Sequence, residues 1–395
     1  MRNIKDEHNL NKKKVLLRLD LNVPLNNGKI TDTTRIDKIL PTINFLLKNN
    51  AKIIILSHAG RPKGKIVKEL SLKPICESLK NKLNQDIRLI SKNIKEVKSA
   101  DLFNTNDEQI VMLENLRFYK EEEQNDNVFA KHLASLADIY VNDAFSCTHR
   151  AHASIFEITK FIPSYAGLQL NLEIDALTKI TSEIKKPITC IIGGSKISTK
   201  INIIKNLIPK FDNIIFVGGM ANNILKFNGH NIGKSIQEDH CDKMIEEIFS
   251  LSVKKNCKII YPEDVTVGKE LNGSPEIKEL KDVSEDELIL DIGPKSIKNI
   301  SNIIAESNTI LWNGPAGYFE NPSFAKGSLE IIKKIIEKSK TNTIYSVVGG
   351  GDTVALLNSV NAVNNFDFVS TAGGAFLEYL EGKELPGIKA LNKYV

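Results

Sequence analysis

The chain has 395 residues, which is long for one hydrophobic core and therefore predicts at least two domains. Its 42% hydrophobic and 26% charged residues are typical of a soluble globular protein, and no apolar run is long enough to predict a membrane span. The 53 basic and 48 acidic residues give a net charge of only +5, and their interspersion argues against a nucleic-acid-binding surface.

The N-terminal stretch and the cysteines indicate the cellular compartment. The stretch MRNIKDEHNLNKKK lacks the apolar core of a signal peptide, so we expect a cytoplasmic protein. The cysteines are widely spaced and form no CxxC pair, which argues against a disulfide framework and a zinc site. We expect five reduced, structural residues: Cys76, Cys147, Cys190, Cys241 and Cys257.

The first half of the chain alternates strand-like and helix-like segments, and its apolar runs end in polar side chains. The runs cover residues 15–25, 52–62, 110–118 and 138–154. If these strands are parallel neighbours, their ends share one edge, and their arginines form a candidate cluster for phosphate and carboxylate groups. Each residue alone would more often be a surface charge or a structural histidine, so the prediction depends on the recurrence. The candidates are Arg18, Arg35, Arg61, Arg117 and Arg150, with His58, His149 and His152 at the same strand ends.

Asp20 and Asn22 follow the first apolar run at alternate positions. In an extended strand, alternate side chains point the same way, so this pair could hold a hydroxyl-bearing substrate. A turn at Asn22, Val23 and Pro24 is an alternative explanation for the asparagine.

From residue 188 onward, apolar runs end in glycine six times, with helix-like stretches between most of them. The runs are residues 188–194, 214–219, 288–294, 309–315, 346–353 and 368–374. Repeated strand, glycine turn and helix units predict an open parallel sheet, whose ligand binds beyond the carboxyl ends of the strands. We therefore expect all six turns along one edge of one sheet, at a nucleotide site.

The turn at residues 349–351 consists of three glycines and is the most informative of the six. Glycines leave the backbone open to a ligand, and the following helix offers N–H groups and the positive end of its dipole to phosphate. Asp352 would repel phosphate unless a cation lay between them, which indicates a magnesium ion carried by a nucleotide. The alternative is that Asp352 only caps the helix.

Two further features of the second half suit a nucleotide. Lys196 and Lys200 lie four residues apart after a glycine pair, so at the start of a helix they would present two cations on one face. Glu320 follows the turn at residues 313–315 and could bind ribose hydroxyls. Solvated lysines and an ordinary surface glutamate are the alternatives.

Eight motifs resemble the phosphoglycerate kinase family, in the same order and over nearly the whole chain. They are RLDLNVP, SHAGRP, ENLRF, THRAHAS, GGSKISTK, WNGPAGYFE, GGGDT and STAGGAFLEYLEGKELPG. The resemblance implies an α/β fold of two Rossmann-like lobes, each a parallel sheet flanked by helices, joined by a hinge helix. It also implies reversible phosphoryl transfer between 1,3-bisphosphoglycerate and MgADP, giving 3-phosphoglycerate and MgATP.

The resemblance assigns the two substrates to two lobes. Residues 1–168, with a tail from about 382 to 395, would form the 3-phosphoglycerate lobe, and residues 169–381 the nucleotide lobe. By matching motifs, the glycerate substrate would be held by Asp20, Asn22, Arg35, His58, Arg61, Arg117 and Arg150. The nucleotide and its Mg²⁺ would be held by Lys196, Lys200, Gly293, Asn313, Glu320, Gly350, Gly351, Asp352 and Thr353, with the metal at Asp352.

The chemistry of this reaction limits what the protein must supply. The carboxylate of 3-phosphoglycerate is itself a nucleophile and needs no general base, so catalysis should consist of alignment and neutralisation of charge. We assign the neutralising roles to Arg35, Lys196 and the helix N-terminal amides at Gly351 and Gly374, with magnesium held by Asp352.

The chain departs from the family pattern at Leu19, Leu21, Ala59 and Ala372. We expect these side chains to pack in the interior and not to touch substrate. The stretch at residues 168–173 also differs, which leaves the detail of the hinge open.

Other functional classes fit the sequence less well. A nicotinamide-dependent dehydrogenase would share the fold, but no GxGxxG opens its first helix, and the GxxxxGK[ST] of Walker-type kinases is absent. A binding module without catalysis would explain the glycines or the arginines, but not both sets. We expect a cytoplasmic monomer that acts on small molecules, with neither a nucleic acid nor a membrane as partner.

Ligand sets on two lobes predict an open form that closes when both ligands are bound, with the connector at residues 163–186 and the tail after Leu385 acting at the hinge. Small-angle scattering should show a modest fall in radius of gyration with nucleotide and 3-phosphoglycerate together, and little change with either alone. An unchanged radius with both ligands, or full contraction with nucleotide alone, would contradict this scheme.

Overall fold

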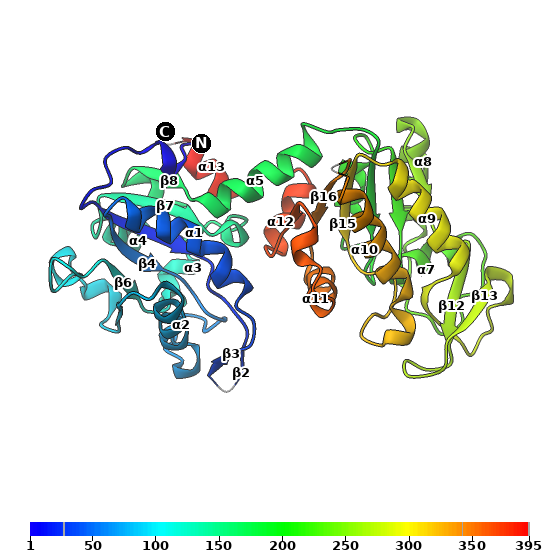
Figure 1. Cartoon of the computed structure of the whole chain (residues 1–395), viewed down its shortest axis with the longest axis horizontal. Coiled ribbons are helices and arrows are strands. Elements are labelled where there is room, and N and C mark those ends of the chain that lie inside the picture. Colours follow the sequence, from blue (N-terminus) through cyan, green and yellow to red (C-terminus); the bar gives the residue numbers. More distant parts are fainter. Residues whose placement is uncertain (27, 342, 394–395) are drawn as a thin grey trace. The chain divides into compact units, whose positions relative to one another are not determined.

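The computed structural model describes residues 1–26, 28–341 and 343–393, which form two compact units (Figure 1). The first unit comprises Met1–Asp175 and the segment from Glu384 onward, and the second comprises Ala176–Lys383. The division falls within helix α5 (Leu168–Thr181), which is part of the connector predicted as a hinge. Ligand-driven closure stays a prediction.

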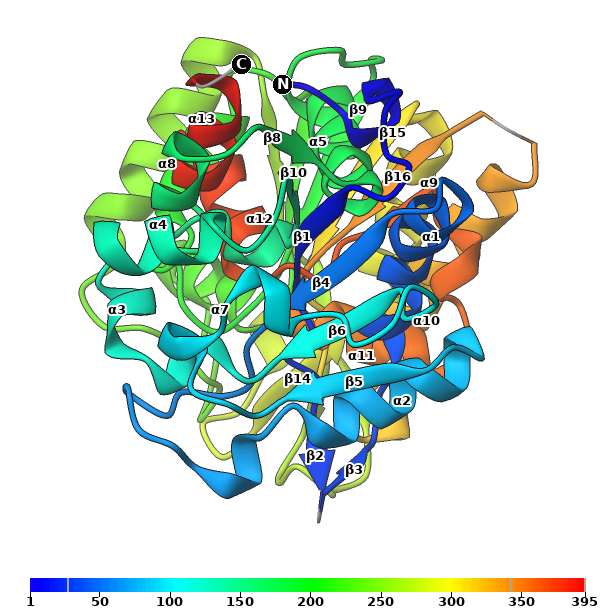
Figure 2. The same ribbon diagram turned by 90° about the vertical axis from the view of Figure 1, so that its left-hand side faces the viewer.

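The first unit is built on a six-stranded parallel sheet in the order β5-β6-β4-β1-β7-β8. Figure 2 shows β5, β6, β4 and β1 side by side in this order. The strands are β1 (Lys14–Leu19), β4 (Lys52–Leu56), β5 (Ile87–Ile90), β6 (Ile110–Leu113), β7 (Ile139–Asp143) and β8 (Ser164–Ala166). A short hairpin, β2 (Leu25–Asn26) and β3 (Lys29–Ile30), precedes the first long helix.

Helices cover the sheet of the first unit, which explains why its strands are almost wholly apolar. In β1, Val15 and Leu17 belong to one core cluster, while Leu16 between them is also fully buried. Because successive side chains of a strand point to opposite faces, both faces of the sheet are covered. The helices are α1 (Thr34–Lys48), α2 (Lys73–Leu83), α3 (Lys120–Glu123), α4 (Asn127–Ala134) and α13 (Pro386–Lys393).

The C-terminal helix α13 packs against the first unit, although it follows the second in sequence. It contacts β8, and the Gly387 N–H donates to the Thr148 carbonyl over 2.8 Å. In Figure 1 this helix is the red one beside β8. A side chain at Gly387 would collide with Thr148 and Ile155, so only glycine allows the C-terminal segment to approach the first unit this closely.

The second unit has a parallel sheet in the order β11-β10-β9-β15-β16-β17. Its strands are β9 (Ile188–Ile192), β10 (Asn213–Phe216), β11 (Lys258–Ile260), β15 (Thr309–Asn313), β16 (Tyr345–Val348) and β17 (Phe368–Val369). Its helices are α6 (Ile201–Leu207), α7 (Gly218–Phe227), α8 (Asp242–Lys255), α9 (Pro294–Glu306), α10 (Lys326–Ser339), α11 (Gly351–Ser359) and α12 (Gly374–Leu380). The fully buried Trp312 of β15 belongs to its main core cluster.

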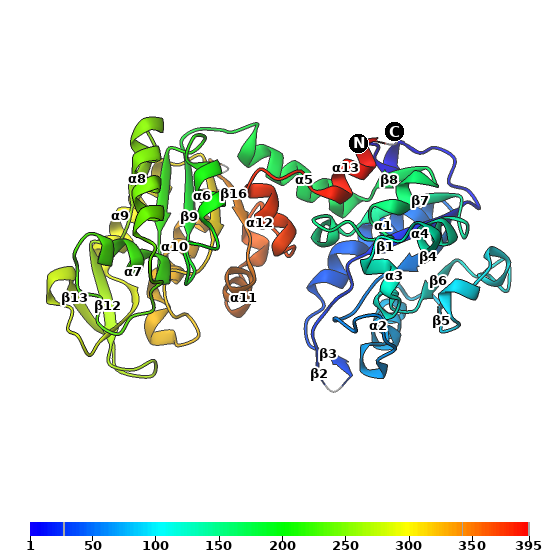
Figure 3. The ribbon, with the colours of Figure 1, turned by 180° about the vertical axis from the view of Figure 1, so that it is seen from behind.

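The prediction that all six glycine turns share one sheet is wrong for residues 288–294. This run is β14 (Leu288–Ile292), which pairs antiparallel with β12 (Asp264–Gly268) in a small sheet completed by β13 (Glu276–Glu279). That sheet packs on α7 around Leu225 (Figure 3). An apolar run ending in glycine indicates a strand but not the sheet that the strand joins, because the pairing depends on distant residues.

Buried positions agree with two further expectations. Leu19, Leu21, Ala59 and Ala372 are all buried, so these departures from the family pattern pack in the interior. All five cysteines are buried free thiols. Among the described residues, no helix combines the length and apolar composition that crossing a membrane requires.

Candidate active site

Arg35 lies at the carboxyl edge of the first sheet, in the first turn of α1. Its Nη1 is 2.9 Å from Asp20 Oδ2 and donates to the Asn22 carbonyl over 2.9 Å. Asp20 Oδ2 also accepts a hydrogen bond from the Ser146 hydroxyl, which follows β7. The Arg35 side chain is 30% exposed, so its guanidinium remains accessible to solvent although it is bonded to Asp20 and the Asn22 carbonyl.

The prediction that strand alternation aligns Asp20 with Asn22 is wrong, because β1 ends at Leu19. The chain turns instead: the Asn22 N–H donates to Asp20 Oδ1 over 3.1 Å. Asn22 Oδ1 accepts from the Gly60 N–H over 2.9 Å, so this side chain fixes the loop that follows β4. Asn22 as a substrate ligand stays a prediction.

The remaining predicted substrate residues differ in exposure. Arg61 and Arg150 are exposed, whereas Arg117 is 8% exposed and its Nη1 donates to the Gly60 carbonyl over 2.8 Å. His58 is also buried. The set therefore combines two exposed guanidinium groups with a largely buried one.

His58 and His152 are held in the neutral form. Burial, followed by the charges of Arg18 and Arg117, holds the pKa of His58 well below its usual value. Burial, followed by the same two arginines, lowers the pKa of His152 to about 3. At neutral pH the arginines supply the positive charge, and these histidines can act only as neutral hydrogen-bonding groups.

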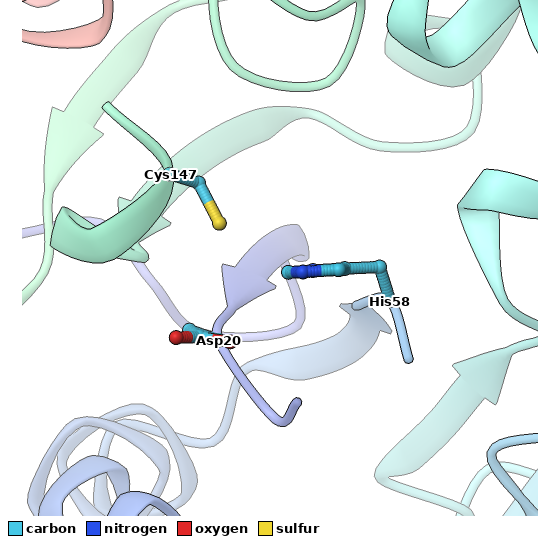
Figure 4. Close-up of side chains that lie close together, drawn as sticks. All are labelled: Asp20, His58 and Cys147. Atoms are coloured by element: carbon cyan, nitrogen blue, oxygen red, sulfur yellow. The ribbon is translucent and has the colours of Figure 1, made fainter. Parts of the chain in front are cut away.

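Arg18 lies beside His58 and near Arg117, as the cluster prediction expects, but it does not face solvent. It is 1% exposed, and its guanidinium lies near the only group of potential metal ligands among the described residues. That group is Asp20, His58 and Cys147, whose ligand atoms lie within 4.8 Å of one another (Figure 4).

In the second unit, the triple-glycine turn lies between β16 and α11 as the sequence predicts. Gly350 has a φ of +100°, a conformation that favours glycine, and a Cβ there would approach Asn313 Nδ2 within 2.6 Å. A Cβ on Gly351 would meet no atom within 4 Å, so the first residue of α11 borders open space. Gly374 is likewise the first residue of α12.

The structure does not support Asp352 as a helix cap. The N-cap residue of α11 is Gly350, which has no side chain, and Asp352 lies exposed in the first turn. Its carboxylate is thus in the position where the helix dipole favours an anion, and it remains accessible.

Asp352 also lines a cavity of about 360 Å³ within the second unit. The walls are glycine backbone and mainly apolar side chains with a few polar groups, as is usual in small-molecule sites. The lining residues are Gly194, Ser195, Gly218, Gly219, Ala221, Asn222, Ile236, Pro262, Val265, Leu271, Leu288, Ile289, Leu290, Asp291, Ile292, Pro315, Ala316, Gly317, Tyr318, Phe319, Glu320 and Asp352.

Glu320 belongs to this lining, but Gly293 and Asn313 lie outside it. Gly293 packs against the Asp264 carboxylate, and Asn313 is buried beside the glycine turn. No sequence pattern assigns a role to Tyr318 or Asn222, which also line the cavity. The glycine pair at residues 218–219 is the signal that could indicate this wall.

Lys200 is linked to the glycine turn through Asn313. Its Nζ donates to Asn313 Oδ1 and to the Gly193 carbonyl, both over 2.5 Å. Asn313 Nδ2 in turn donates to the Gly349 carbonyl over 2.7 Å. Thr353 Oγ1 accepts from the Gly314 N–H over 2.8 Å, which fixes the neighbouring loop to the start of α11.

The prediction that Lys196 and Lys200 share one helical face is wrong, because α6 begins only at Ile201. The Ser198 N–H donates to Glu238 Oε2 over 3.0 Å, which holds the preceding segment as a loop. Lys196 is exposed in that loop, whereas Lys200 turns inward. Burial lowers the pKa of Lys200 to about 8, although Cys190 and Asp352 act in the opposite direction.

Known proteins resemble this chain over nearly its whole length. The phosphoglycerate kinase family model matches residues 4–383. The phosphoglycerate kinase of Wolbachia pipientis subsp. Culex pipiens is 47% identical over 387 residues, covering 98% of this chain and 97% of that protein. That of Bartonella bacilliformis is 44% identical, covering 98% and 97%. The structure of phosphoglycerate kinase from Coxiella burnetii aligns with a TM-score of 0.91 at 40% identity, covering 99% of this chain and 98% of that one.

The low pKa of Lys200 predicts that nucleotide binding weakens as pH rises through about 8. A bound phosphate favours the charged lysine and raises its pKa, so the free protein must take up a proton to bind above pH 8. Calorimetry with MgADP from pH 7 to 9.5 should show Kd rising by up to about tenfold per pH unit.

The matched control is Lys200→Arg, because a guanidinium stays charged over this range. Its absolute affinity can differ, but its Kd should be nearly independent of pH. A wild-type Kd that stays constant above pH 8, or the same pH dependence in both proteins, would contradict the assignment.

Proposed function

The chain belongs to the phosphoglycerate kinase family, and from this premise we propose how its residues carry out the reaction. It is a phosphotransferase of glycolysis that moves a phosphoryl group reversibly between 1,3-bisphosphoglycerate and ADP, giving 3-phosphoglycerate and ATP. One observation carries the residue assignment. In each unit, the matching polar residues and glycine turns lie mainly at the carboxyl edge of a parallel sheet, and Gly293, which follows β14 of the small antiparallel sheet, is the exception.

The first unit would bind 3-phosphoglycerate. Exposed guanidinium groups of Arg61 and Arg150 suit its phosphate, because arginine offers paired planar donors. Neutral His58 would donate a hydrogen bond to a substrate oxygen without adding charge. Arg35, held by Asp20 but still exposed, would meet the phosphoryl group during transfer.

The second unit would bind the nucleotide. The base and ribose would occupy the mainly apolar cavity, with the Glu320 carboxylate accepting from ribose hydroxyls. The phosphate chain would lie against the first amides of α11, near Lys200. Lys196, exposed in the preceding loop, would reach the terminal phosphate.

The family uses a magnesium nucleotide, and the donors at this edge fit that ion. Asp352 presents an exposed carboxylate that is not used as a cap. Mg²⁺ usually takes one or two carboxylates and completes its shell with phosphate oxygens and water. When bound, the ion would supply neutralisation of phosphate charge, and Asp352 is the residue that would hold it.

The residues at both sites support transfer without a covalent protein intermediate. The acceptor carboxylate is ionised at neutral pH, so no side chain needs to remove a proton. Arg35, Lys196 and the amides of Gly351 and Gly374 would neutralise charge on the moving phosphoryl group. Neutral His58 and His152 leave this charge balance unchanged across the physiological range.

Replacement of Arg35 tests the neutralisation step. In Arg35→Ala, turnover should fall far more than substrate affinity, because the lost charge matters mainly during transfer. A barrier increase of roughly 3 to 5 kcal/mol corresponds to a loss of some hundreds-fold or more. Steady-state kinetics with ATP and 3-phosphoglycerate would measure it.

Lys48→Ala is a matched control, since this exposed cation lies at the other end of α1. Its kinetics should equal those of the wild type. An unchanged kcat in Arg35→Ala would show that Arg35 does not neutralise charge during phosphoryl transfer.

Replacement of Asp352 distinguishes a metal ligand from a structural residue. In Asp352→Asn, the magnesium concentration for half-maximal activity should rise and turnover should fall, while the Tm stays nearly unchanged because the side chain is exposed. Magnesium titrations and thermal unfolding provide both measurements. Wild-type magnesium dependence in the variant would show that Asp352 does not hold the ion.

A further inference from the structure

Arg18 is an almost fully buried cation at the end of β1, and four groups surround its guanidinium. Nη2 lies 3.1 Å from His58 Nδ1 and 3.8 Å from Cys147 Sγ. Nε donates to Ser154 Oγ over 3.0 Å, and Nη1 donates to the Leu19 carbonyl.

These contacts explain the metal-like grouping of Asp20, His58 and Cys147. Figure 4 shows the three side chains directed toward a common space. Arg18 Nη2 is hydrogen bonded to both the imidazole and the thiol, so a cation from the chain itself already uses these lone pairs. A metal ion would have to displace a buried guanidinium, and the grouping therefore does not indicate a metal site.

The direction of the contact between Arg18 and His58 follows from the chemistry of arginine. A guanidinium carries only donors and stays protonated in proteins. His58 Nδ1 must therefore accept, with its lone pair directed at Nη2. A neutral imidazole has a single N–H, so that proton lies on Nε2.

The surroundings of His58 disfavour a second proton on the ring. A proton on Nδ1 would face an N–H of Arg18 and remove the hydrogen bond. Besides Arg18, the groups that lower the pKa of His58 include Arg117, His152 and Arg35. Asp20 and Cys147 also lie within 4.8 Å of the imidazole, but Asp20 is paired with Arg35 and the Cys147 thiol with Arg18. The buried carboxyl of Glu122 lies near Arg18 but accepts its hydrogen bonds from the Ser154 hydroxyl and N–H, and not from His58.

We propose that Arg18 is a positioning residue that holds His58 in the Nε2–H tautomer, so that His58 presents a fixed donor to an oxygen of the bound glycerate substrate. Arg18 acts through His58, because its Nε, Nη1 and Nη2 already bond groups of the chain, namely Ser154, the Leu19 carbonyl, His58 and Cys147. The role of the donor rests on the proposed function, in which His58 binds 3-phosphoglycerate. The tautomer itself can be measured in the free protein.

The tautomer is tested first in the unmodified, ligand-free chain. Long-range proton–nitrogen NMR on protein labelled with ¹⁵N-histidine distinguishes the two neutral tautomers and the cation. The chain has seven histidines, and the spectrum of His58→Gln identifies the signal of residue 58. We expect an Nε2–H signal that does not titrate between about pH 5 and 9, a range that spans the ordinary histidine pKa. An Nδ1–H signal, or titration near the ordinary pKa, would overturn the proposal.

The effect on the substrate is tested with Arg18→Met, which removes the donors and keeps an apolar stem. We expect His58 to show a mixture of tautomers and the KM for 3-phosphoglycerate to rise about tenfold, as for loss of one well-oriented hydrogen bond. The KM for ATP should stay within about twofold, because nucleotide binding uses the other unit. Unchanged His58 signals and an unchanged KM for 3-phosphoglycerate in folded Arg18→Met would overturn the proposal.

Arg88→Met is the matched control, because Arg88 is a paired arginine on β5 of the same sheet. Its Nε donates to Glu108 Oε1 over 2.7 Å. This variant should lose stability without altering the His58 signals or the KM for 3-phosphoglycerate. An equal rise of that KM in Arg88→Met would show that the effect of Arg18 is only structural.

The two proposals fail in different ways. If Arg18→Met does not fold, the wild-type spectrum alone decides the tautomer. Absence of phosphoryl transfer by the wild-type chain would refute the proposed function. It would not affect the conclusion that Arg18 holds His58 in the Nε2–H tautomer.

Discussion

Parallel strands buried on both faces have one accessible boundary for ligands, the edge where their carboxyl ends meet the following loops. Each unit of this protein depends on that constraint. Because helices cover both faces of the first sheet, Asp20, His58 and Arg117 can emerge only past the ends of β1, β4 and β6. In the second unit, the same constraint gathers the turns after β9, β10, β15 and β16.

Charge in the first unit is divided between exposed and buried groups. Arg35, Arg61 and Arg150 keep contact with solvent, where an anionic substrate can reach them. Arg18 lies inside, with Asp20, Cys147 and the buried Glu122 among the groups that interact with it. Burial raises the pKa of Glu122. Polar and acidic groups of the interior surround Arg18, whereas the substrate meets the exposed arginines with neutral hydrogen-bond donors beside them.

The second unit uses backbone where the first uses side chains. Glycine turns supply backbone amides and open space for a ligand. The buried side chain of Asn313 links these turns to Lys200. Asn313 joins Lys200 to the Gly349 carbonyl, so the position of the lysine and the shape of the turn depend on each other. The small antiparallel sheet adds Leu288, Leu290 and Ile292 to the cavity wall, a contribution from outside the main sheet.

The sequence by itself determined the alternation of strands and helices, the glycine turns at strand ends, and the family. These features are local: an apolar run, a glycine triplet or the order of eight motifs can be recognised without knowing which segments touch. Tertiary structure alone decided the rest. Arg18 points inward because it bonds His58, and α6 begins after Lys200 because Glu238 holds the preceding loop. β14 lies outside the main sheet because it pairs with β12. Each of these partners lies far along the chain. Residue type fixes the chemistry that a side chain can perform, but burial and long-range hydrogen bonds decide whether it meets solvent, substrate or another part of the protein.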